Sequence, residues 1–167
     1  DTDGRSGEAT VRKNKSGIVV KGLHDLAVRF SRCCNPVPGD EIVGFVTRGR
    51  GVSIHRTDCI NVINLPEDER GRLIDAEWQG AENPTSTEQY STEIQIFANN
   101  RIGLFADISK VFTEKQIDIT SMNVRTSKQG RATIIMTFDI HGTEELNRIT
   151  DKIRQIDGVL DIQRTTG

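Results

Sequence analysis

Residues 99–108 read Asn-Asn-Arg-Ile-Gly-Leu-Phe-Ala-Asp-Ile, and they mark the point where a strand gives way to a helix. Ahead of this stretch, apolar and polar residues alternate from Glu93 to Ala98, which is the period of a half-buried strand. From Ile102 onward, apolar side chains recur at helical spacing as far as Phe112. The stretch therefore predicts a strand, a tight turn and an amphipathic helix.

The turn itself has a composition suited to binding an anion. Asn99 or Asn100 is the expected helix N-cap, and Gly103 allows close approach of the backbone. The free N–H groups at a helix N-terminus suit a carboxylate. The alternative is that Gly103 serves only the packing of the helix on a sheet.

The segments that follow complete a βαββαβ order over residues 91–167, the split ferredoxin-like arrangement. Thr143 is the expected N-cap of the second helix, followed by acidic residues in its first turn. The remaining expected elements are strands at 117–124, 132–140 and 159–162, a hairpin turn at 128–131, and a helix whose apolar stripe is Leu146, Ile149, Ile153 and Ile156.

Residues 18–79 form a separate, smaller and β-rich module, so the whole chain is of the α+β class. Strands are expected at 18–20, 26–31, 42–47, 51–55 and 73–78, with a rigid Pro-rich turn at 35–40. Thr57 or Asp58 is expected to cap a short helix ending near Leu65. Such a small core needs a staple or a partner.

Two polar segments frame these modules. Residues 1–17 have almost no apolar groups and are expected to form a flexible tail, and residues 80–90 read as a linker. No apolar run is long enough to span a bilayer, so no membrane partner is expected. Three cysteines, an odd number, argue against a disulfide framework and indicate a cytoplasmic protein. Because the chain begins at Asp1 without methionine, we expect it to be a piece of a longer protein.

The 99–108 stretch, together with Asp157-Gly158-Val159, resembles the ACT domain over residues 91–167. The strings Arg32 to Phe45 and Thr47 to Cys59 resemble the conserved-cysteine module of long RelA/SpoT-type alarmone enzymes, also called the zinc-finger or ribosome-intersubunit domain. In that family this module directly precedes a C-terminal ACT domain, as it does here.

The resemblance implies a non-catalytic regulatory fragment of a stringent-response enzyme. The parent would be a GTP pyrophosphokinase, a (p)ppGpp hydrolase or both, with its catalytic domains N-terminal to this region. The family's cysteine module docks on ribosomal RNA near A-site tRNA, and its ACT domains commonly dimerise and bind amino acids. A small branched-chain amino acid is the expected ligand, at Asn100, Arg101, Ile102, Gly103 and Leu104.

Cys33, Cys34, His55 and Cys59 form a constellation with metal-ligand chemistry. Three thiolates and one imidazole suit tetrahedral zinc, and His55 and Cys59 would share a face if that segment were helical. The adjacent cysteines, however, reach one ion only on a bent backbone. Two alternatives remain open: thiols that pack beside a histidine without metal, and redox reactivity of the vicinal thiols.

A basic hairpin lies between the two cysteine segments. Arg48, Arg50 and Arg56 occur there without an acidic residue between Ile42 and Thr57, and guanidinium groups bind phosphate in a bidentate manner. Composition alone favours a solvated hairpin, whereas the resemblance implies contact with ribosomal RNA, to which Arg32 is also assigned. A thiol enzyme built on Cys59 or Cys34 and His55 lacks an orienting third residue. The remaining alternative to a sensing role is a purely structural dimerisation unit.

Overall fold

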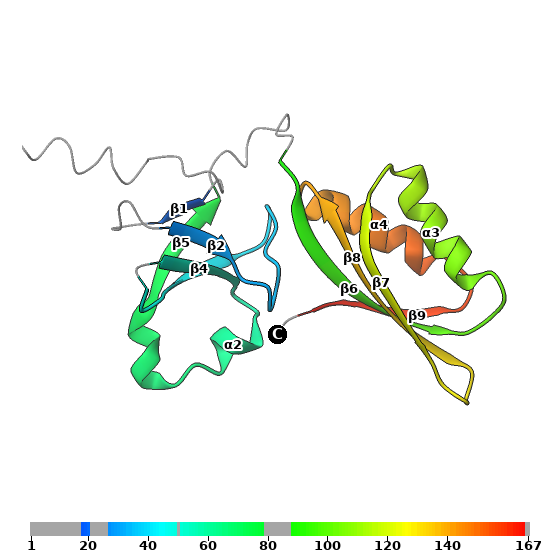
Figure 1. Ribbon diagram of the computed structural model, residues 1–167, viewed down its shortest axis with the longest axis horizontal. Helices are drawn as coiled ribbons and strands as arrows, with labels where there is room; N and C mark the ends of the chain where they lie inside the picture. Colours follow the sequence, from blue (N-terminus) through cyan, green and yellow to red (C-terminus); the bar gives the residue numbers. More distant parts are fainter. Residues whose placement is uncertain (1–17, 21–26, 50, 79–87, 166–167) are drawn as a thin grey trace, which may run out of the picture. The chain divides into compact units, whose positions relative to one another are not determined.

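The computed structural model describes residues 18–20, 27–49, 51–78 and 88–165, and the chain divides into two compact units, with the boundary in the sequence between Ser86 and Thr87. The expected tail at 1–17 and most of the expected linker at 80–90 lie outside the described residues. Figure 1 shows a β-rich first unit and a second unit with two helices against one sheet. The α+β fold expected from the sequence is confirmed.

The second unit is a four-stranded antiparallel sheet in the order β7-β8-β6-β9, with both helices on one face (Figure 1). The order along the chain is βαββαβ, as the sequence predicts. Its elements are β6 (Tyr90–Asn99), α3 (Leu104–Glu114), β7 (Ile119–Thr126), β8 (Arg131–Ile140), α4 (Thr143–Arg154) and β9 (Val159–Arg164).

The core of the second unit lies between the helices and the two central strands. Every second residue of β6 and β8 is buried, because successive side chains of a strand point to opposite faces. Phe112 of α3 meets Phe138 of β8 edge to face, with ring centroids 4.8 Å apart. The edge strand β7 carries little of this core, and Met122 is 37% exposed.

The helices of the second unit do not begin where their polar residues suggest: α3 begins later than expected, and α4 begins one residue earlier. The N-cap of α3 is Gly103, at φ +83°, and not Asn99 or Asn100. The N-cap of α4 is Gly142, so Thr143 is already the first helical residue. Neither cap residue makes a side-chain hydrogen bond, because glycine has no side chain to donate or accept one. Ile102 lies before α3 and is 99% exposed, which corrects its assignment to the helical stripe.

The first unit is a five-stranded sheet in the order β1-β5-β3-β4-β2, in which β2 and β4 are parallel and the other pairs are antiparallel. All five strands appear where the sequence predicts them. They are β1 (Ile18–Val20), β2 (Ala27–Phe30), β3 (Ile42–Val46), β4 (Gly51–Arg56) and β5 (Leu73–Trp78).

This sheet buries a different cluster on each face. One cluster contains Ile18, Val52 and Ile54, with the stacked rings of Phe30 and Trp78 packed against it. The other is small: Cys34, Cys59 and Val62 are its buried members, with Cys33, Val43 and Leu73 at its margin. So few apolar side chains bury little area, and this second cluster is where the first unit needs additional stabilisation.

Two short helices lie between β4 and β5. They are α2 (Ile60–Ile63), whose N-cap is Cys59, and the 3₁₀ helix η1 (Glu67–Arg72), which was not expected from the sequence. The expectation that Thr57 or Asp58 caps this helix is wrong, because Asp58 pairs with Arg56 instead. Among the described helices, none is long and apolar enough to cross a membrane.

Candidate metal centre

The vicinal cysteines lie in a closed turn directly after β2. The N–H of Asn35 donates to the carbonyl of Ser31 at 3.0 Å, and Asn35 itself has a left-handed backbone at φ 47°. Asparagine tolerates this conformation better than most residues. The turn supplies the bend that two adjacent cysteines need to face one point, and its last residue, Asn35, is also the first residue of the Pro-rich turn at 35–40.

The other half of the cluster comes from the end of β4 and the turn that follows it. His55 is a strand residue that pairs with Val43 of β3, and Cys59 is the N-cap of α2. The two residues therefore do not share a helix face, which corrects the geometric argument from their spacing. A turn closed by the Cys59 N–H and the Arg56 carbonyl, 3.0 Å apart, brings Cys59 back beneath the strand end.

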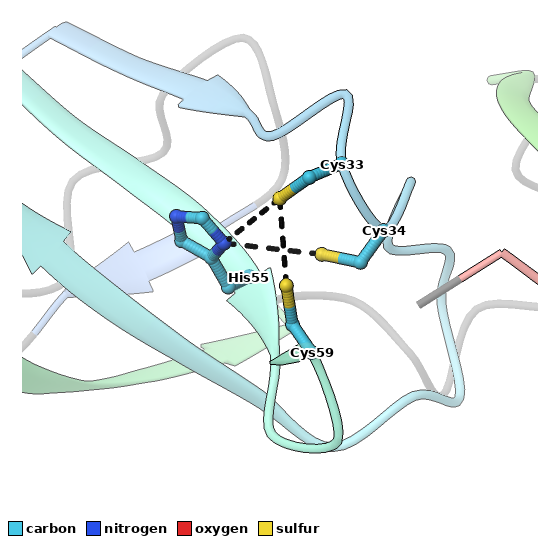
Figure 2. A group of neighbouring side chains, drawn as sticks. All are labelled: Cys33, Cys34, His55 and Cys59. Carbon is cyan, nitrogen blue, oxygen red and sulfur yellow. Dashed lines mark hydrogen bonds between the residues drawn. The ribbon is translucent and has the colours of Figure 1, made fainter. Parts of the chain in front are cut away.

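The four side chains converge on one point (Figure 2). Cys33 Sγ lies 3.4 Å from both Cys59 Sγ and His55 Nδ1, and Cys34 Sγ lies 3.9 Å from His55 Nδ1. All four candidate ligand atoms are within 4.8 Å of one another. In a tetrahedral zinc site, Zn–S bonds of about 2.3 Å and a Zn–N bond of about 2.0 Å separate the ligand atoms by about 3.5–3.8 Å. The residues present therefore fit a closed, four-ligand zinc site.

The pKa shifts of the three thiols and the imidazole are also consistent with a cation-binding site. Burial raises the pKa of the Cys34 and Cys59 thiols, and charge repulsion from the Cys33 thiolate acts on both in the same direction. Burial also acts on Cys33, but hydrogen bonds with Ser31, Asn61 and the neighbouring thiols bring its pKa below the ordinary value. Burial lowers the pKa of His55, so its imidazole is neutral and ready to bind a metal.

Arg56 links the cysteine turn after β2 to the turn that follows β4. Its backbone N–H donates to Cys34 Sγ at 3.3 Å, and its guanidinium donates to the Cys34 carbonyl at 3.1 Å. The same guanidinium binds both carboxylate oxygens of Asp58, at 2.9 and 2.6 Å. The residue is only 5% exposed, so the expectation that it contacts RNA does not fit its position.

The other arginines assigned to RNA differ in their surroundings. Arg32 is exposed and adjacent in sequence to the cysteine turn. Arg48 lies at the tip of the β3–β4 hairpin with its side chain 80% exposed, and its guanidinium is 3.9 Å from the Glu69 carboxylate. Arg50 lies outside the described residues.

The loop from Asn100 to Leu104 is fixed by hydrogen bonds of Arg101 and Asn100 and by the burial of Leu104. The Arg101 guanidinium donates to the Asp157 and Ile102 carbonyls at 2.8 and 3.1 Å, and to the Asp107 carboxylate at 2.8 Å. The Asn100 N–H donates to the Gly130 carbonyl. Leu104 is fully buried. Arg101 is therefore engaged with protein groups, and it acts on the loop by fixing its shape.

Sequence reasoning missed Arg56 as a support of the cluster and Asp107 as the partner of Arg101. For Arg56, the sequence signal that could have indicated its role is an aspartate two residues later, Asp58, at the end of a predicted strand. The second pair joins residues six apart across a helix start, and no periodicity indicates it.

Comparison with known families identifies both units. Residues 18–79 match the RelA/SpoT RIS domain, and residues 86–164 match the ACT domain. The GTP pyrophosphokinase of Streptomyces coelicolor is 40% identical over 90% of this chain, and that of Escherichia coli K12 is 36% identical over 93%. The chain spans 17% and 20% of the length of these curated relatives.

One solved structure similar to the second unit is the ACT domain from GTP pyrophosphokinase of Chlorobium tepidum. It is 22% identical, with a TM-score of 0.42, and the match covers 46% of this chain and 99% of that one. The two matched families define this chain as a RIS domain followed by an ACT domain, a pair of regulatory domains. The chain belongs to the RelA/SpoT-type proteins and corresponds to a regulatory portion of them.

Proposed function

We propose that this chain is the non-catalytic regulatory part of a stringent-response GTP pyrophosphokinase or (p)ppGpp hydrolase. It couples the state of the ribosome and its A-site tRNA to alarmone metabolism exerted by N-terminal catalytic domains. The observation that carries this proposal is the four-ligand cluster in the RIS domain, which fixes the turn that follows the exposed Arg32. Arg48 extends the basic character of the same unit.

In this proposal Cys33, Cys34, His55 and Cys59 hold a zinc ion that has a structural role. Bound zinc stabilises the fold because its ligands are brought together only in the folded state. All four coordination positions are taken by protein, so no position is left for a substrate. Arg56 and Asn35 fix the backbone around the ion. Arg32, Arg48 and Arg50 lie outside the cluster and bind phosphates of ribosomal RNA.

Ribosome binding through Arg48 is tested by co-sedimentation of the full-length parent with ribosomes at two salt concentrations. Each phosphate contact releases condensed counterions, so the Arg48→Ala variant should bind more weakly and flatten the salt dependence by about one unit of slope. Arg148→Ala is the matched control, since it removes one exposed arginine from the ACT domain. Arg32→Ala and Arg50→Ala extend the test to the other two assigned arginines. Equal ribosome binding by Arg48→Ala and Arg148→Ala at both salt concentrations would show that Arg48 of the hairpin does not contact the ribosome.

A second part of the proposed function is amino-acid sensing by the ACT domain. The Gly103 turn presents the first N–H groups of α3 beside an exposed Ile102, which suits the carboxylate and apolar side chain of a small branched-chain amino acid. Since Arg101 already binds Asp107, and the Asn100 and Leu104 N–H groups donate to the Gly130 and Arg101 carbonyls, recognition within residues 100–104 falls to the backbone of residues 101–103. Calorimetric titration with the amino acids tests this, and Gly103→Val should abolish any heat. No heat with the wild-type chain would end the sensing proposal.

The competing proposal is an ACT domain that only dimerises. Its edge strand β7 and the exposed side chains of Ile102 and Met122 leave apolar surface for a second copy. Light scattering with and without amino acids separates the two functions. A dimer that no amino acid alters, on a parent whose ribosome affinity is insensitive to salt, favours the structural unit.

A further inference from the structure

The metal cluster contains two sulfur atoms in van der Waals contact that differ in access to solvent. Cys33 Sγ and Cys59 Sγ are 3.4 Å apart and are not joined by a disulfide. Cys33 is partly exposed, whereas Cys59 is fully buried. An accessible thiol beside a sheltered one is the arrangement in which one sulfur meets an oxidant and the other resolves the product.

The vicinal pair is a poor alternative for the same chemistry. Adjacent Cα atoms lie about 3.8 Å apart, which is below the range of about 4.4–6.8 Å found for disulfides. Cys34 is also buried, and it accepts a hydrogen bond from the Arg56 N–H. The contact across the cluster, and not the neighbour in sequence, is therefore the geometry suited to bond formation.

We propose that Cys33 and Cys59 form a reversible disulfide in response to peroxides, and that this disulfide and a bound metal ion exclude each other. The inference goes beyond the proposed function, because it rests on the two sulfur positions and not on ribosome binding. Oxidation of this pair removes two of the four ligands and leaves Cys34 and His55, too few to close a tetrahedral site.

The reaction balances with hydrogen peroxide as the oxidant. The Cys33 sulfur attacks one peroxide oxygen, the O–O bond breaks, and the leaving hydroxide takes a proton to form water. The Cys59 sulfur then attacks the resulting sulfenic acid, the S–S bond forms, the S–O bond breaks, and a second water leaves. Two thiols and one peroxide thus give one disulfide and two waters, and a dithiol reductant reverses the change.

Tryptic mapping of the oxidised chain tests this directly. Cleavage after Arg32, Arg48, Arg56 and Arg70 places Cys33 and Cys34 on peptide 33–48 and Cys59 on peptide 57–70. Without reduction, we expect these two peptides to be joined, and fragmentation between Cys33 and Cys34 should assign the link to Cys33. The Cys34→Ser variant should give the same joined pair, whereas Cys33→Ser should not.

The same oxidised sample is assayed for zinc with a chromogenic chelator. Release of about one zinc ion per disulfide is expected if the cluster holds metal. Peptide mapping needs no metal, so it still decides the proposal in a chain purified without zinc. A bridge through Cys34, a link only between two chains, or an overoxidised Cys33 without a bridge would each overturn it. Zinc that stays bound while the bridge forms would overturn the exclusion.

Discussion

At the scale of single residues, Arg56 links the cluster to the rest of the first unit. Its guanidinium satisfies the Cys34 carbonyl and pairs with Asp58 while being almost fully buried. Removing the guanidinium would leave the buried Cys34 carbonyl without this hydrogen-bond donor, whereas Asp58 is 59% exposed. The role of this residue follows from contacts with both cysteine segments, and not from its position in a basic run.

We expect Arg56→Ala to lower the free energy of unfolding by about 1–3 kcal/mol, because the Cys34 carbonyl loses its buried hydrogen-bond donor, whereas the Asp58 carboxylate is 59% exposed and can be hydrated. Arg56→Lys should recover only part of this loss, since lysine cannot bind Asp58 and Cys34 at once. Urea unfolding followed by Trp78 fluorescence measures both variants. Arg48→Ala, an exposed site in the same unit, should change stability by less than about 0.5 kcal/mol. If Arg56→Ala lowered the free energy of unfolding as little as Arg48→Ala does, the role assigned to Arg56 would be contradicted.

The raised thiol pKa values lead to a pH prediction for metal binding. Cys34 and Cys59 keep their protons at neutral pH when no cation is present, and a bound metal must displace them. His55 contributes no proton, because burial lowers its pKa. We expect about two protons or more to be released per zinc ion, so that zinc affinity rises with pH across the neutral range. Calorimetry in buffers of different ionisation enthalpy counts these protons, and a count near zero would contradict the thiol ligands.

At the scale of elements, two glycines show what close packing demands of the turns and strands. A Cβ on Gly158 would lie 3.0 Å from the Asn99 carbonyl oxygen, and the backbone there has φ +100°. A Cβ on Gly44 would lie 2.9 Å from Val52 Cγ1 and 3.0 Å from Ile74 Cγ1. A side chain at Gly158 would combine backbone strain with a clash against backbone, whereas a side chain at Gly44 would overpack the core against other side chains.

Gly158→Ala should destabilise the ACT domain by about 2–3 kcal/mol, as strain and steric overlap add. Gly130→Ala is the matched control, since its φ of +77° is similar but its Cβ would meet nothing within 4 Å. The difference between the two variants in chemical denaturation isolates the contact with Asn99. Equal losses would show that the close approach costs nothing.

Gly44→Ala should destabilise the RIS domain by about 1–3 kcal/mol through overpacking of the β3–β4–β5 core. Gly71→Ala, in the same unit and with open space around it, serves as the reference. Trp78 fluorescence during urea unfolding reads both. A Gly44→Ala chain as stable as Gly71→Ala would mean that Val52 and Ile74 can shift aside freely.

Periodicity predicted the strands and both ACT helices, because alternation and the 3.6-residue repeat are local properties of the chain. It failed at the helix starts: Gly103 and Gly142 are the caps, while Asn100 and Thr143 carry the stronger local signal. The four ligand residues could be found from their chemistry alone. The turn that aims Cys33 and Cys34 could not, because it depends on the left-handed Asn35 and on Arg56 binding Cys34 from another segment.

At the scale of the whole molecule, the two units differ in what stabilises them. The ACT domain buries a continuous apolar layer between its sheet and helices, whereas the cluster on one face of the RIS sheet has only Cys34, Cys59 and Val62 as buried members among the described residues. Trp78, the single tryptophan of the chain, lies in the RIS domain and is stacked on Phe30 at 5.5 Å. Its fluorescence therefore reports on one unit alone.

Removal of metal by a chelator should lower the midpoint of the thermal transition seen by Trp78 by about 10 °C or more. The transition of the ACT domain, followed by helical circular dichroism, should stay in place, because α3 and α4 belong to that unit. A chelator that shifts both transitions equally would contradict two separately stabilised units.

We propose that Cys33, Cys34, His55 and Cys59 hold one zinc ion, which is the stabilising element of the first unit. X-ray absorption at the zinc edge, on the whole chain purified without chelators and with its metal content measured, tests it most directly. We expect about one zinc per chain, with three sulfur neighbours at about 2.3 Å and one nitrogen at about 2.0–2.1 Å. A stably folded chain without zinc, or a zinc shell composed of oxygen and nitrogen alone, would contradict it.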